Sequence, residues 1–149
     1  GILDNTGTLI RRISASYGFM DVAARERHRE IIAIDGPTLR AFNTDGTQLW
    51  SVIDKDPRIR TVRLSSMKLS PDGHWIAAAL KGGLLLVYDA SNGMPLASLT
   101  DGALNYSSIT WSATAEGTPL LVVAAAGGLQ CFEVRPAAPV GTGTTTDVP

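Results

Sequence analysis

The sequence predicts an all-β protein in which a unit of four short antiparallel strands is repeated, and three observations support this prediction. First, a pair made of a large apolar residue and an acidic or amide residue recurs at regular intervals. Second, glycine, proline, serine and threonine interrupt the apolar runs every 8 to 12 residues, as turns between short strands do. Third, no segment repeats its apolar residues with the period of 3.6 that an amphipathic helix requires.

The repeat defines the architecture. Its four pairs are spaced by 39, 46 and 44 residues, and they are Leu3-Asp4, Phe42-Asn43, Tyr88-Asp89 and Phe132-Glu133. Glycines recur at two positions equivalent in each repeat. They are Gly36, Gly83 and Gly128 before the pairs, and Gly7, Gly46 and Gly93 after them. A period of about 40 to 47 residues with four strands per unit is typical of β-propeller blades, which are small antiparallel sheets around a central axis.

The first elements along the chain are a pair of strands near residues 2–13, followed by a full blade near 20–53. In that blade we expect a strand that ends near Ala24 and a charged loop that runs to Glu30. A hairpin then follows, with strands 39–42 and 48–53 joined by Asn43-Thr44-Asp45-Gly46. Asp-Gly between β-prone runs is a strong hairpin signal, because glycine tolerates the positive φ of a tight turn.

The second full blade is expected near 64–100 and a three-stranded set near 107–134. The second blade opens with a hairpin turn at Pro71-Asp72-Gly73 and closes with one at Ala90-Ser91-Asn92-Gly93. The sequence therefore predicts blades over residues 1–134, about three to three and a half in number. Residues 135–149 are rich in Pro, Gly and Thr, and we expect a flexible tail there.

Two segments resemble known propeller families. Leu69-Ser70-Pro71-Asp72-Gly73-His74-Trp75-Ile76-Ala77 resembles the inner hairpin of WD-repeat blades, and Val87-Tyr88-Asp89 stands where that family places its Trp-Asp pair. The segment 39–50 is similar to quinoprotein-type blades. The sequence contains no Trp-Asp dipeptide, and neither histidine takes the Gly-His position of WD repeats. The resemblance implies a propeller that acts as a binding scaffold.

A closed propeller typically has about 4 to 8 blades, so this chain is expected to form an incomplete ring. It looks like the C-terminal part of a larger propeller. We expect the missing blades to come from another chain or from a second copy in a homo-oligomer, with a strand from that source pairing beside residues 129–134. An open arc exposes one blade face and one strand edge, so association is expected to be close to obligatory.

Composition and motifs predict no catalytic residue, no metal and no cofactor. The net charge of −1 gives no field that would attract nucleic acid, and no apolar run is long enough to span a membrane. The two histidines lack partners at zinc-ligand spacing. The acidic residues Asp4, Asp45, Asp72 and Asp89 stand in turns and are expected to cap backbone amides.

The remaining special residues are expected to serve packing. The three tryptophans, Trp50, Trp75 and Trp111, are placed on strands D, B and A, counted outward from the axis, where they can pack between blades. Cys131 lies in an apolar run and is expected to be buried and unreactive.

A protein partner is expected on the face that carries the D–A and B–C loops. Aromatic residues and arginines are enriched in interface hot spots. The candidates on this face are Tyr17, Phe19, Lys55, Arg58, Arg60, Lys81 and Tyr106. The opposite face would carry Arg25, Arg27, His28 and Arg29, whose charge Glu26 and Glu30 dilute.

Two other functions stay open at the level of sequence. The chain could be the propeller portion of an enzyme, either a quinoprotein-like dehydrogenase or a hydrolase gated by a propeller. It could also be an envelope assembly factor built from quinoprotein-type blades. The compartment is open too: we favour the cytoplasm or the nucleus, and the envelope or periplasm is the alternative.

Overall fold

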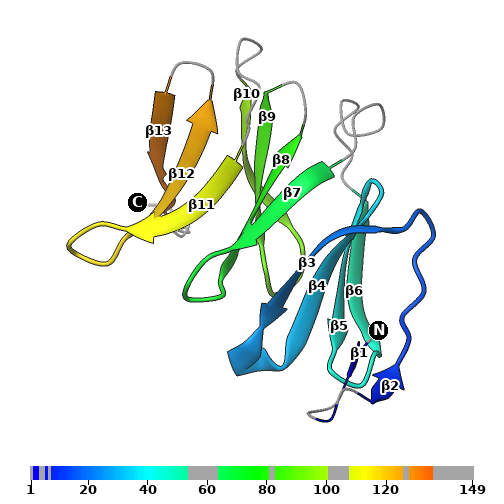
Figure 1. Cartoon of the computed structure of the whole chain (residues 1–149). Coiled ribbons are helices and arrows are strands. Elements are labelled where there is room, and N and C mark those ends of the chain that lie inside the picture. The colour runs from blue at the N-terminus through cyan, green and yellow to red at the C-terminus, as the bar shows by residue number, and fades with distance from the viewer. Residues whose placement is uncertain are drawn as a thin grey trace, which may run out of the picture.

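A computed structural model describes residues 2–3, 6, 8–53, 64–80, 83–100, 108–125 and 128–135. Its strands form two four-stranded sheets, one three-stranded sheet and one two-stranded sheet, all antiparallel. Figure 1 shows the three larger sheets side by side in chain order, and the described strands close no ring. The prediction of an all-β, incomplete propeller is confirmed.

Each larger sheet follows the predicted order of hairpins. Blade I consists of β3 (Phe19–Arg25), β4 (Glu30–Asp35), β5 (Thr38–Asn43) and β6 (Gln48–Ile53), with a short 3-10 turn, η1 (Glu26–His28), between its first two strands. Blade II consists of β7 (Leu64–Leu69), β8 (Trp75–Leu80), β9 (Leu84–Asp89) and β10 (Pro95–Thr100). Blade III consists of β11 (Ser108–Ala113), β12 (Pro119–Ala125) and β13 (Gly128–Glu133).

Two further strands, β1 (Ile2–Leu3) and β2 (Leu9–Arg11), pair with each other ahead of blade I. The strand pair predicted near residues 2–13 is therefore present. The predicted tail from residue 136 onward lies outside the described residues, as does the turn glycine Gly7.

The cores lie between blades, because side chains of a strand alternate between its two faces. Ile76, Ala78 and Leu86 of blade II face blade I, where they form one buried cluster with residues such as Ile32 and Leu39. The neighbours of these blade II residues in sequence face the other way. There Ala77, Ala79, Leu85 and Val87 form a second buried cluster with Ile109, Leu121 and Val123 of blade III.

All three tryptophans take the predicted strands and pack against these clusters. Trp50 of β6 packs against the cluster between blades I and II, while Trp75 of β8 and Trp111 of β11 pack against the cluster between blades II and III. The indole Nε1 of Trp111 also donates a hydrogen bond of 2.9 Å to the carbonyl oxygen of Lys68, which ties β11 to β7. Packing between blades, as predicted, is confirmed.

The acidic residues predicted to cap turns do so where the structure describes them. Asp45 accepts a hydrogen bond from the N–H of Thr47, Asp72 from that of His74, and Asp89 from that of Ser91. Asp4 lies outside the described residues.

Two of the sequence-based expectations are wrong. Cys131 is exposed, because it lies on the face of β13 that points away from blade II. Arg25 was expected among the charged residues exposed on the opposite face, but it is the last residue of β3 and only 4% of it is exposed.

Candidate functional site

Two of the residues predicted to bind a partner lie among the described residues, and both belong to the start of blade I. Tyr17 is 66% exposed and precedes β3, and Phe19 is 38% exposed and begins it. The ring of Phe19 stands edge-on to the ring of Phe42, with centroids 6.2 Å apart. Part of Phe19 therefore covers blade I, and Tyr17 is the more available of the two.

A buried carboxylate holds Tyr17 in place. Asp35, at the end of β4, accepts hydrogen bonds from the backbone N–H groups of Ser16 at 2.8 Å and Tyr17 at 2.7 Å. The side chain of Tyr17 lies against Gly36, so the loop before β3 and the turn between β4 and β5 share one face, as predicted. Burial raises the pKa of Asp35, but these bonds and the Arg40 guanidinium outweigh it and leave that pKa below its ordinary value.

The other five predicted residues, Lys55, Arg58, Arg60, Lys81 and Tyr106, lie outside the described residues. They stay predictions.

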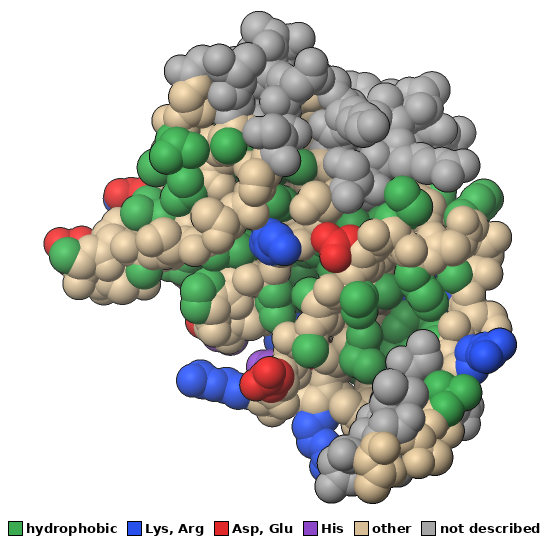
Figure 2. All heavy atoms as spheres, in the orientation of Figure 1, with side chains coloured by type: hydrophobic (Ala, Val, Ile, Leu, Met, Phe, Trp, Pro, Cys, Tyr) green, Lys and Arg blue, Asp and Glu red, His purple; other side chains and the backbone are tan. Residues whose placement is uncertain are grey.

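A pocket of about 270 Å³ opens on the opposite face, between the first hairpins of blades I and II. One wall is the loop between β3 and β4, and the other is the loop between β7 and β8. The lining residues are Ala24, Arg25, Glu26, Arg27, His28, Leu69, Ser70, Pro71, Asp72 and Gly73. Figure 2 shows the hollow in this region, with basic, acidic and histidine side chains at its rim.

Hydrogen bonds fix the wall from blade II. Ser70 is buried, and its hydroxyl donates to Asp72 at 2.5 Å and accepts the N–H of Trp75 at 2.9 Å. The N–H of Gly73 donates to the carbonyl oxygen of Ser70 at 2.9 Å. Burial raises the pKa of Asp72, but the bonds from the Ser70 hydroxyl and the His74 N–H outweigh it, so that pKa lies below its ordinary value.

The wall from blade I is fixed by its backbone and by a buried arginine. The N–H of Arg29 donates to the carbonyl oxygen of Glu26, and the N–H of Thr44 donates to that of Arg29. Arg29 has a φ of 55°, in the left-handed region that non-glycine residues rarely adopt. The guanidinium of Arg25 pairs with Glu30 and reaches across to Gly73, whose carbonyl oxygen accepts its Nε–H at 2.9 Å.

Sequence reasoning missed this pocket. The signal that could have found it is the repeat itself, because residues 26–29 and 70–74 are the first loops of successive blades and must lie side by side in a propeller. Within the described ranges, no cluster of three or more His, Cys, Asp or Glu side chains could hold a metal ion. No helix in the same ranges is long and apolar enough to cross a membrane.

The sequence matches no protein-family model, and no curated protein matches it. Solved structures do resemble the fold. The β-propeller domain of Cps50 (Swd1) from Myceliophteria thermophila is 17% identical with a TM-score of 0.68, over 89% of this chain and 46% of that chain. The WD40 repeats of RRP9 are 16% identical with a TM-score of 0.66, over 84% and 37%. The C-terminal WD40 domain of Sif2 is 20% identical with a TM-score of 0.60, over 81% and 35%.

These likenesses confirm that the chain has the fold of WD40-type propeller blades. The chain spans between 35% and 46% of the length of these three structures.

Proposed function

We propose that this chain is a non-catalytic propeller scaffold that binds another protein, and that its ring is completed by a second copy or by another chain. The observation that carries the second part is the state of blade III. Its strand β13 pairs with β12 and with no other described strand, and Leu129 on it is 75% exposed. Figure 2 shows hydrophobic side chains at the surface over this blade.

The edge of β13 that no described strand covers has a definite register. The N–H of Val134 donates to the carbonyl oxygen of Pro119, and hydrogen bonding between antiparallel strands alternates along the chain. Leu129, Cys131 and Glu133 therefore turn their backbone groups toward the open edge. An added strand would pair with these three residues, which is the common geometry of strand addition.

The face of blade III that points away from blade II is also apolar. Leu121 and Val123 face blade II, so Leu120, Val122 and Ala124 lie on the other face. Burial of apolar surface stabilises a protein by about 2.5 kcal/mol per 100 Å², so a further blade packed on this face would stabilise the incomplete ring.

Light scattering on the full chain, followed by a dilution series, tests the assembly. We expect a mass of at least two chains, each of 15.7 kDa, when the chain is alone, or an aggregating arc that becomes monodisperse only with a partner chain. A monodisperse monomer with cooperative unfolding would contradict the assembly.

The partner surface that we propose is the face of Tyr17, Phe19, Lys55, Arg58, Arg60, Lys81 and Tyr106. Reversing the charge of Arg58 and Arg60 together tests it. Capture of partners from a lysate should weaken while the circular-dichroism spectrum stays the same. Unchanged capture would contradict a partner site on this face. The control is a charge reversal at Arg135, which pairs with Glu133.

A further inference from the structure

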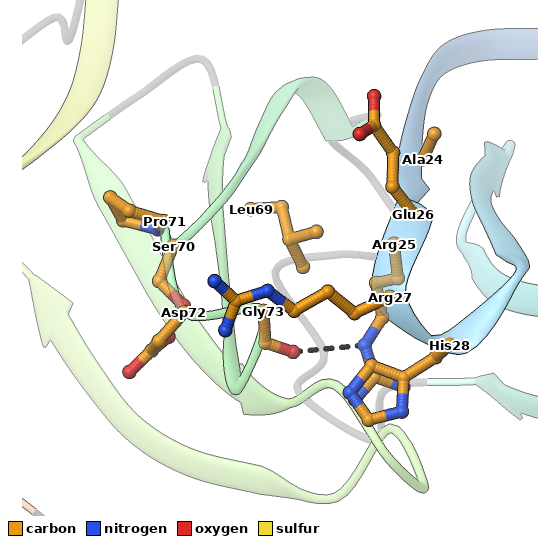
Figure 3. Close-up of a pocket in the computed structure, with 10 residues that line it drawn as sticks. All are labelled: Ala24, Arg25, Glu26, Arg27, His28, Leu69, Ser70, Pro71, Asp72 and Gly73. Atoms are coloured by element: carbon orange, nitrogen blue, oxygen red, sulfur yellow. Dashed lines mark hydrogen bonds between the residues drawn. The ribbon is translucent and has the colours of Figure 1, made fainter.

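Two buried polar groups of the pocket between blades I and II are already paired: the Arg25 guanidinium with Glu30, Gly73 and Ala90, and the Ser70 hydroxyl with Asp72 and Trp75. Arg27 and His28 are exposed and make no hydrogen bond or ion pair with any described residue. The side chain of Arg27 reaches across the pocket toward Ser70, whereas that of Glu26 points away (Figure 3).

Arg27 lines the pocket and makes no ion pair with a described residue, so its guanidinium is available to an anionic ligand. The guanidinium is a planar fork of N–H donors that matches the two oxygens of a carboxylate. His28, next to it on η1, adds ring nitrogens at the same rim. We propose that this pocket binds the carboxylate of an Asp or Glu side chain on a partner protein, with Arg27 as the principal donor.

The opposite wall favours a carboxylate over a phosphate. Asp72 lines the pocket and is ionised at neutral pH, because the Ser70 hydroxyl and the His74 N–H stabilise its charged form. A negative charge on this wall repels a dianionic phosphate group more strongly than a carboxylate of single charge. The Asp72 carboxylate therefore favours a ligand that brings a single negative charge to Arg27.

Hydrogen bonds also hold both walls of the pocket, so the Arg27 side chain is the main group that must be ordered on binding. Backbone hydrogen bonds hold the loop of Arg27 on both sides, through Arg29 to Glu26 and through Thr44 to Arg29. The bond from Arg25 to Gly73 joins the two walls. Preorganised walls keep more of the interaction energy as affinity. The left-handed backbone of Arg29 is the kind of strain that persists where the surrounding structure holds it, often at binding sites.

This site is separate from the proposed Tyr17 face and rests on the proposed function only in assuming a protein partner. The test uses fluorescence anisotropy of the full chain at low salt, with labelled Gly-Ser decapeptides. The peptides carry Glu, Gln or phosphoserine at the same positions. We expect the Glu peptide to bind about tenfold more tightly than the Gln peptide, and more tightly than the phosphoserine peptide.

Variants identify the donor. Arg27→Ala should reduce binding of the Glu peptide to the level of the Gln peptide, and Arg27→Lys should restore it only in part, because an ammonium group lacks the planar fork. Arg12→Ala is the matched control, since Arg12 is also an exposed arginine without a described partner. Circular dichroism checks that each variant is folded.

Several outcomes would overturn the proposal: equal binding of the Glu and Gln peptides, tighter binding of phosphoserine, no binding at all, or equal losses from Arg27→Ala and Arg12→Ala. None of these depends on the light-scattering result or on Arg58 and Arg60. A failure of the pocket is therefore distinguishable from a failure of the scaffold role.

Discussion

The Nε of Arg25 donates a hydrogen bond of 2.9 Å to the carbonyl oxygen of Gly73, and this bond joins the first hairpin of blade I to the first hairpin of blade II. The same guanidinium donates to the carbonyl oxygen of Ala90 at 3.1 Å and pairs with Glu30. One buried arginine therefore connects three turns from two blades. Because Gly73 also lines the pocket, the bond sets both the packing of the blades and the shape of the candidate site.

Replacing this arginine should loosen the junction between the blades. Arg25→Met keeps most of the side-chain volume but leaves Glu30 without its partner and two carbonyl oxygens without their donor. Breaking a buried pair in this way costs roughly 3 kcal/mol of unfolding free energy. Urea denaturation measures it. Arg135→Met, which breaks an exposed pair with Glu133, should cost less than about 1 kcal/mol. Equal small losses would mean that apolar packing alone holds the junction.

Gly93 should tolerate no side chain, for steric as well as conformational reasons. Its φ is 75°, and a Cβ there would lie 2.7 Å from the ring of Trp50 and 2.8 Å from Val52 of the neighbouring blade. Gly117 has a similar φ of 85° but open space around it, so it is the matched control. Gly117→Ala should cost about 1 kcal/mol for the left-handed backbone, and Gly93→Ala about 2 to 4 kcal/mol. Thermal unfolding compares them, and similar losses would mean that Trp50 moves aside.

The carboxylate of Asp35 should make the fold sensitive to acid. Its pKa in the folded chain is below the ordinary value of 3.8, so its stabilisation is complete above that value and is lost as the pH falls through the folded pKa. Asp35→Asn should cost about 1 to 3 kcal/mol at pH 7, because the N–H groups of Ser16 and Tyr17 and the Arg40 guanidinium lose their charged acceptor. Chemical denaturation of both proteins at pH 7 and pH 3 should show the difference narrowing in acid. A difference that does not change with pH would contradict the assignment.

The fold was predictable because its signals are local. The strand Gln48–Ile53 has the bounds that the sequence predicted, since an Asp-Gly turn precedes it. The charged run from Arg25 to Glu30 was predicted as a loop, and the structure places a short turn there between two strands.

What the sequence did not predict depends on distant partners. The sequence predicts that the charged residues around Arg25 are exposed. Arg25 is buried because its guanidinium donates to the carbonyl oxygens of residues 73 and 90, which are distant in the sequence. Cys131 reads as buried because its run is apolar, but no described blade covers its face. The pocket is formed by loops from two blades, so no single sequence motif predicts it. Five of the seven predicted partner residues lie outside the described residues, so that surface stays a prediction.

The outer face of blade III gives the sharpest test of assembly, because the single cysteine of the chain lies on it. Val122 is paired with Cys131 in the sheet and shares that face. Val122→Lys would place an unpaired charge where another blade is expected to pack, which costs several kcal/mol if the face is buried and little if it faces water. We therefore expect light scattering to show dissociation of the Val122→Lys assembly. A maleimide should label Cys131 slowly in the wild-type assembly and rapidly in the variant.

Leu96→Lys is the control, because Leu96 is comparably apolar, 49% exposed and on the outermost strand of blade II. Equal masses and equal labelling rates for the wild type and Val122→Lys would show that this face is open to water and that no further blade packs on it.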